Sequence, residues 1–339
     1  MKCFIKSQVL LALLIVVYPV FTQNFHYIDS LNNLLKTSTN DSLRVHLLNE
    51  ISWEYKYANT DTAVAIAKKA YQLAENRKIY PGAVTSLMYI AIACQIKGER
   101  AHAINYYNQC LDIAIKHDLK DRIASVNNNL GVLYKNLGDH VKAIECYQKS
   151  LDIYEEQENQ YGIAISLGNI GNIFYFQKNY DKAKDYLIKA NKINYQINNK
   201  RGISDCYISL GSIYSAKGNS EKALETLTKA LNIKKEMNDH KGISICMNLI
   251  GEEYLQNREY DKACDFFNSA IRIKKEIDDK FGLVISYSNI SEAFLAKKEY
   301  QKARQKAGSA LNIADSINSL QDIPDLYLLI ARTDRKSTR

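Results

Sequence analysis

A repeat of 40 residues constrains what this chain can fold into more than any other feature of its sequence. Glycine recurs at Gly131, Gly171, Gly211 and Gly251, so each copy lies 40 positions after the last. Alanine recurs with the same 40-residue period, at another position of the unit, at residues 103, 143, 183, 223, 263 and 303. Self-similarity at a fixed period predicts a stack of similar units, in which each unit buries its apolar face against its neighbours.

Each repeat is expected to form two helices joined by a tight turn. Ile203, Tyr207 and Leu210 are spaced by four and three residues, which places their side chains on one face of a helix. Residues 217–220, Lys-Gly-Asn-Ser, supply a glycine that can end this helix, and Asn and Ser side chains that favour the start of the next. A second helix is expected to follow around Ala223, and the small residues let the two helices approach closely.

The repeat also carries a recognisable motif. In one copy it consists of Leu130, Gly131, Tyr134, Gly138-Asp139, Ala143, Tyr147 and Ser150. This motif resembles the tetratricopeptide repeat family. The 40-residue unit, longer than the usual ~34 residues, resembles the long-unit subclass found in exported arrays of bacterial signal-transduction proteins. The resemblance implies an all-α fold, a right-handed α-solenoid of about seven helix-turn-helix units plus a partial eighth.

The expected array covers residues 41–332, with units that start near residues 41, 81, 121, 161, 201, 241, 281 and 321. Residues 27–40 are expected to form an N-terminal capping segment, since terminal units of such arrays are often irregular. In the first unit, Ile51, Ser52 and Tyr55 match the first-helix columns one residue late. This shift predicts a turn that is one residue shorter than in later units.

The start of the chain has the pattern of a secretory signal peptide. Lys2 and Lys6 precede an uncharged apolar run over residues 9–21, and a polar stretch follows. Residues 1–22 are therefore predicted to be a signal peptide, and the protein is predicted to be exported, either periplasmic or membrane-associated. Two alternatives remain: the apolar run is retained as an anchor, or the protein is a cytoplasmic scaffold.

The end of the chain has an unusual composition. Residues 334–339, Asp-Arg-Lys-Ser-Thr-Arg, match the translation of a common sequencing-library adapter, which predicts an artefact, the alternative being a natural polar tail. Exported arrays of this kind resemble the sensor halves of bacterial regulators, in which a membrane helix and an effector domain follow. The alternative function is therefore the N-terminal fragment of a membrane-bound sensor histidine kinase or DNA-binding regulator. Membrane association is expected only through such a missing segment or an uncleaved signal.

The sequence contains no pattern that indicates catalysis. It has no glycine-rich phosphate loop, no nucleophile elbow and no HExxH motif. The cysteines after residue 22 form no CxxC pair and have no histidine at metal-ligand spacing, so they are expected to act as small core hydrophobes. The visible chain is therefore predicted to have no enzymatic activity, no metal site and no cofactor.

The excess of basic residues does not indicate a nucleic-acid partner. The formal net charge is +8. The lysines fall mostly on the expected second helices, with Asp and Glu interspersed, which is typical of a solvated surface. A nucleic-acid-binding surface would need clustered basic side chains to contact the phosphates. No nucleic acid is therefore expected to bind.

The predicted binding surface lies on the first helix of each unit, because the resemblance implies that these helices line a concave groove. Asn offers two donors and an acceptor, so a ladder of Asn could bind the backbone of an extended peptide. The alternative is that Asn is simply frequent on every surface of this chain. Because Lys135 is the only cation among them, a clamp for a terminal carboxylate is not expected. The expected partner is a protein or a peptide, and the ligand-groove residues are Asn128, Asn129, Lys135, Asn169, Asn172, Tyr175, Ser209, Ser212, Asn248, Glu252, Asn289 and Glu292.

Overall fold

The computed structural model describes residues 19–317, 319 and 322–337, and the regular structure in this part of the chain is entirely α-helical. The predicted all-α fold is confirmed. The chain divides into two compact halves, an N-terminal half of residues 1–158 and a C-terminal half of residues 159–339. Residues 1–18, which make up most of the predicted signal peptide, lie outside the described residues.

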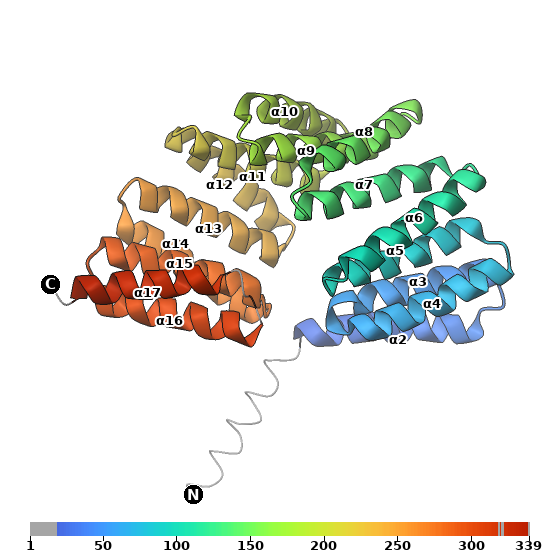
Figure 1. Ribbon diagram of the computed structural model, residues 1–339, viewed down its shortest axis with the longest axis horizontal. Helices are drawn as coiled ribbons and strands as arrows, with labels where there is room; N and C mark the ends of the chain where they lie inside the picture. The colour runs from blue at the N-terminus through green and yellow to red at the C-terminus, as the bar shows by residue number, and fades with distance from the viewer. Residues whose placement is uncertain (1–18, 318, 320–321, 338–339) are drawn as a thin grey trace, which may run out of the picture. The chain divides into compact units, whose positions relative to one another are not determined.

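The N-terminal half contains an additional helix followed by three helix pairs (Figure 1). The paired helices pack side by side as α3 with α4, α5 with α6 and α7 with α8, and α4 also packs on α5. The helices are α2 (Pro19–Thr37), α3 (Asp41–Ala58), α4 (Thr60–Asn76), α5 (Tyr80–Ile96), α6 (Arg100–Lys116), α7 (Lys120–Asn136) and α8 (His140–Glu156).

The C-terminal half contains four further helix pairs and the first helix of an eighth repeat. Each helix packs on the next, and the first helices of successive repeats also contact each other, as α9 with α11 and α13 with α15. This is the packing of an α-solenoid, and it confirms the expected repeats. The helices are α9 (Gln160–Phe176), α10 (Tyr180–Gln196), α11 (Lys200–Ala216), α12 (Ser220–Glu236), α13 (His240–Gln256), α14 (Tyr260–Glu276), α15 (Lys280–Ala296), α16 (Tyr300–Ser316) and α17 (Ile323–Ser337).

The recurrent small residue brings the two helices of a pair together. A Cβ atom added to Gly211 would lie 2.7 Å from the Leu227 side chain, and one added to Gly131 would lie 2.5 Å from the Tyr147 ring. Serine serves the same column by a different contact, because the Ser291 hydroxyl donates to the Ala303 carbonyl at 2.7 Å. The repeats with glycine in this column therefore place a large side chain of the second helix directly over the backbone of the first.

From α4 to α16, each turn between successive helices contains three residues, and the middle residue adopts the left-handed conformation. Gly98, Gly138 and Gly218 have φ between 73° and 78°, as expected for glycine after a helix. Most of the turns take this conformation without glycine, a feature that the sequence does not reveal. The non-glycine residues are Lys78, Asp118, Glu158, Lys178, Asn198, Asn238, Arg258, Asp278 and Lys298.

The first repeat differs from the others in its turn. The Ser52 hydroxyl donates to the Ala63 carbonyl at 2.8 Å, which is the Ser291 contact with one residue fewer between the partners. Only Asn59 separates α3 from α4, because α3 extends to Ala58. The Asn59 N–H donates to the Tyr55 carbonyl, and its side chain accepts from the Thr62 N–H. The turn is therefore two residues shorter than in later repeats. The sequence had predicted that it would be one residue shorter.

Both ends of the array continue into helix. Ile28 and Leu31 of α2 pack against Leu47 and Ile51 of α3, so the N-terminal segment covers the first pair. Residues 334–337, the described part of the predicted artefact, continue α17. None of the described helices combines the length and the apolar character needed to cross a membrane.

The described cysteines are buried and form no disulfides, which supports their expected packing role. Burial raises the pKa of the Cys110, Cys206 and Cys246 thiols to about 12. Such thiols are almost entirely protonated near neutral pH and are inert as nucleophiles or metal ligands.

Candidate functional site

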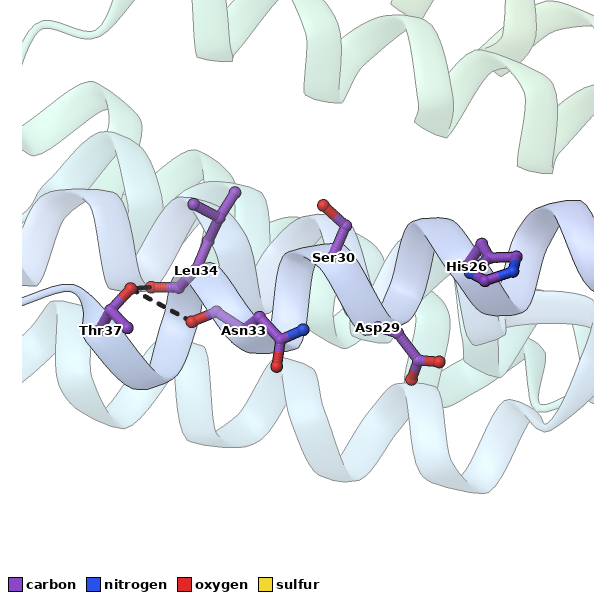
Figure 2. Close-up of a pocket in the computed structure, with 6 residues that line it drawn as sticks. All are labelled: His26, Asp29, Ser30, Asn33, Leu34 and Thr37. Atoms are coloured by element: carbon purple, nitrogen blue, oxygen red, sulfur yellow. Dashed lines mark hydrogen bonds between the residues drawn. The ribbon is translucent and has the colours of Figure 1, made fainter.

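An open hollow lies along α2 of the N-terminal half, and Figure 2 shows the six residues that line it. All six belong to this one helix, so no second element forms an opposing wall. The Thr37 hydroxyl is hydrogen-bonded to carbonyl oxygens of its own helix, those of Asn33 and Leu34, at 3.2 Å. A ligand here would meet only one wall, whereas ligand sites are usually concave. The six residues are His26, Asp29, Ser30, Asn33, Leu34 and Thr37.

Three hollows of the C-terminal half lie on first helices and follow the repeat. Asn169, Ser209, Leu249, Asn289 and Leu329, each 40 residues apart, all contribute to them. We call the first-helix residues that line these hollows the inner strip. Its main members are Ile165, Gly168, Asn169, Asn172, Tyr175, Asp205, Ser209, Ser212, Leu249, Glu252, Ile285, Asn289, Glu292, Asp325, Leu328 and Arg332.

The structure brings most of the predicted groove residues of this half into the inner strip. These residues share an intermediate exposure, which leaves part of each side chain open to solvent. Asn169, Asn172 and Ser209 line the first hollow, between α9, α10 and α11. The rest are Tyr175, Ser212 and Glu252 in the second hollow, and Asn289 and Glu292 in the third.

Asn248 does not lie in the groove as the sequence predicted. It is buried, and its Oδ1 atom accepts a hydrogen bond from the Ser286 hydroxyl at 2.9 Å. The N-terminal half repeats this pair, because Ser86 donates to Asn49 Oδ1 at 2.8 Å. The 37- or 38-residue spacing of Asn and Ser is the signal that could have assigned Asn248 to the core.

The predicted groove residues of the N-terminal half lie on α7 and are already engaged within the fold. The Asn129 side-chain amide donates to the Ser125 carbonyl at 3.1 Å and lies 3.2 Å from the Met88 sulfur atom. Asn128 is half-buried, and so is Lys135, whose pKa is lowered by burial. The Asn129 amide therefore has less freedom to bind a ligand than an unpaired one would have.

The same half carries an aromatic pair that the groove prediction did not include. The rings of Trp53 and Tyr89 are 5.0 Å apart, and the Lys56 ammonium lies 3.7 Å from the centre of the indole ring. Lys56 also donates to the Trp53 carbonyl at 3.1 Å. Trp53 is half-buried, so the pair stabilises the first two repeats of the array.

The first hollow is polar but carries no free charge. It has a volume of about 220 Å³. The Asn199 amide donates to Asn194 Oδ1 at 2.8 Å, which fixes two of its walls. The Asp205 carboxylate at its edge is held 2.7 Å from the Lys234 ammonium. Asn172 and Ser209 have no hydrogen-bond partner within the described part of the chain.

The second and third hollows are more acidic than the first, and the third is also more apolar. Burial raises the pKa of Glu252, although the Asn289 amide donates to this carboxylate at 2.6 Å and opposes the shift. In the third hollow, the exposed side chains of Ile285 and Leu328 lie among acidic residues such as Asp325. The inner strip therefore changes from amide-rich at α9 to acidic and aliphatic at α17.

The described residues show no metal-binding arrangement. No group of three or more His, Cys, Asp or Glu side chains in this part of the chain is placed to hold a metal ion. The chemistry available on the inner strip is hydrogen bonding, ion pairing and apolar contact.

Two family models match parts of the chain. The tetratricopeptide repeat model matches residues 122–196, and the model of the soluble NSF attachment protein, SNAP, matches residues 167–312. Comparison with curated protein sequences gives no match.

Several solved structures share the fold at low sequence identity. A Signal Transduction ATPase with Numerous Domains (STAND) protein with a tetratricopeptide repeat sensor from Pyrococcus horikoshii superposes with a TM-score of 0.64 at 19% identity. The match covers 92% of this chain and 49% of that one, so this chain spans about half of its length. A Rap protein complexed with competence and sporulation factor gives a TM-score of 0.58 at 12% identity, and the match covers 93% of this chain and 98% of that chain. At these identities the likeness shows the fold alone.

Proposed function

We propose that this α-solenoid, which matches the tetratricopeptide repeat model over residues 122–196, is a scaffold that binds an extended peptide segment of a partner protein along the inner strip. Asn172 and Ser209 carry the proposal, because they are half-buried polar groups in a hollow and have no partner within the described residues. Partial burial limits the hydrogen bonds that such polar groups can make to water. A ligand that supplies the missing hydrogen bonds is therefore favoured at this site.

The spacing of the strip suits an extended chain. Packed helices lie ~8–10 Å apart, and an extended peptide advances ~3.4 Å per residue. About three peptide residues therefore pass each first helix. Side chains of successive repeats, such as Asn172 and Ser209, can then bind backbone groups at regular intervals, whatever the peptide sequence.

We also propose that this binding serves signalling, as the sensor or adaptor portion of an exported bacterial protein. The likeness to arrays with a sensor role supports this, since the Pyrococcus protein is described as having a tetratricopeptide repeat sensor. The basic and apolar pattern of residues 1–22 supports export. The alternative is that the visible chain is the N-terminal fragment of a membrane-bound sensor histidine kinase or DNA-binding regulator and acts through a downstream effector domain.

Binding of peptides selected from a displayed random library tests the scaffold. We expect the double variant Asn172→Ala, Ser209→Ala to bind a selected peptide about tenfold more weakly, because two net hydrogen bonds contribute about 1–2 kcal/mol. Its melting temperature should stay close to that of the wild type, since neither group has a partner to lose.

Asn248→Ala is the matched control on the next first helix. It leaves the Ser286 hydroxyl without its buried acceptor, so it should lower the melting temperature and leave peptide affinity nearly unchanged. If the double variant binds the selected peptide as tightly as the wild type, the inner strip is not the binding surface.

A further inference from the structure

One position makes the first hollow unlike the rest of the inner strip. Gly168 is the only glycine in its repeat column, where the other units carry Met88, Asn128, Ile208, Asn248, Ser288 and Leu328. A Cβ atom added to Gly168 would have no atom within 4 Å. The missing side chain therefore leaves an open space, and the hollow extends from the first helices to Leu187 and Asn194 of the second helix α10.

The lining of this hollow, the Gly168 pocket, has an apolar part and a polar part. Ala164, Ile165 and Leu187 supply aliphatic surface. Asn172 and Ser209 supply a donor and acceptors that no described residue occupies. A ligand group that fits must therefore have a short aliphatic stem and a head that both donates and accepts.

The charges around the pocket are already balanced. Asp205 is the only charged residue of the lining, and its carboxylate is held by the buried Lys234 ammonium. Lys234 is also 3.0 Å from Asp239. A cationic ligand group would compete with Lys234, and an anionic one would face the Asp205 charge, so either would lose hydration without a free counter-charge.

We propose that the Gly168 pocket binds the carboxamide side chain of a glutamine residue in the bound peptide. Its volume of about 220 Å³ leaves room for one side chain of this size. The two methylene groups contact the aliphatic surface, and the amide head pairs with Asn172 and Ser209. The inference rests on the proposed scaffold function and adds a sequence preference to it.

Filling the pocket tests the proposal. Gly168→Leu adds a side chain into open space on a helix, so it should fold at least as stably as the wild type. Gly308→Leu is the matched control, because a Cβ atom there also meets nothing within 4 Å and Gly308 lies in α16, away from the pocket. Circular dichroism checks that both variants are folded.

The probe is a displayed library of random peptides, selected separately on the wild type and on each variant. Wild type and Gly308→Leu should enrich peptides with glutamine at one fixed position. In a synthetic copy of such a peptide, changing this glutamine to glutamate or leucine should weaken binding about tenfold. Gly168→Leu should lose the preference and bind the glutamine and leucine peptides alike.

The outcomes separate this inference from the function on which it rests. Peptides that bind the wild type with no preference at any position overturn the glutamine pocket and leave the scaffold in place. Enrichment of lysine, arginine or acidic residues at the fixed position overturns the carboxamide assignment. Failure to enrich any peptide over a blank surface overturns the scaffold function itself.

Discussion

At the scale of single residues, two buried lysines show how the same column of the repeat acquires different roles. Lys234 and Lys274 lie 40 residues apart on α12 and α14, and both are buried. Lys234 pairs with the carboxylates of Asp205 and Asp239. Burial lowers its pKa, but the two carboxylates outweigh burial, so the pKa lies above its ordinary value.

Lys274 has neutral partners instead. Its ammonium donates to the Ser286 hydroxyl at 2.7 Å and to the Gly282 carbonyl at 3.1 Å. Burial lowers its pKa from 10.5 to about 8, and the more distant charges of Asp279 and Glu252 only partly oppose this shift. The folded chain thus holds a buried ammonium without a paired carboxylate at neutral pH.

We expect Lys274→Met to raise the free energy of unfolding by roughly 1–2 kcal/mol at neutral pH, because it removes a buried unpaired charge. In the wild type the unfolded chain binds this proton more tightly than the folded chain. The free energy of unfolding should therefore rise with pH from about 8 to 10.5. Urea unfolding at several pH values measures both effects, and the variant should lack this rise.

Lys234→Met is the matched control for this prediction. It leaves two carboxylates without their cation, so it should lower the free energy of unfolding by about 1–3 kcal/mol, less than for a fully buried pair because Asp205 is exposed. Equal losses in the two variants would show that Lys274 is as well paired as Lys234, contrary to the structure.

At the scale of helices and turns, the left-handed turn residues are the points of local strain. The turns centred on Lys178 and Gly218 are equivalent: both have positive φ, and Asn179 and Asn219 begin the next helix by accepting from the N–H groups of Lys182 and Lys222. The left-handed conformation costs a residue with a side chain roughly 1–2 kcal/mol, and glycine little.

We expect Lys178→Gly to raise the free energy of unfolding by about 1 kcal/mol and Gly218→Ala to lower it by a similar amount. Chemical denaturation of the two variants measures both. If Lys178→Gly lowers stability instead, the greater freedom of glycine in the unfolded chain outweighs the relief of strain.

The sequence predicts the helix pairs well because the 40-residue period follows from the packing contacts that recur between paired helices. Glycine recurs at positions 131, 171, 211 and 251 because a large side chain of the second helix, such as Leu227 at Gly211, lies against the first helix there. The turn conformation at Lys178 was missed because it depends on helix-end hydrogen bonds and not on residue type. Asn248 was misplaced because an amide on a first helix can face either the groove or the core, and only Ser286 of the next repeat decides which.

At the scale of the whole molecule, each half presents a different surface. The C-terminal half carries the inner strip, which runs from amides on α9 to acidic and aliphatic side chains on α17. In the N-terminal half the Asn129 amide is bound internally and Trp53 pairs with Tyr89. Peptide binding along the amide-rich part is therefore expected to depend on the C-terminal half.

Export, which we propose from residues 1–22, is tested by expression of the full chain in a bacterial host. We expect the protein in the periplasmic or membrane fraction, with a mass that shows whether residues 1–22 have been removed. Recovery from the cytoplasm with these residues intact would contradict export and favour an intracellular scaffold.

The most direct test of the central claim is photo-crosslinking of a selected peptide to the chain, followed by mapping of the linked residues by mass spectrometry. Binding along the inner strip predicts crosslinks on α9, α11 and α13, at or beside Asn169, Ser209 and Leu249, and their loss when unlabelled peptide competes. Crosslinks concentrated on the second helices α14 and α16, or on α2, would place the ligand elsewhere and contradict the claim.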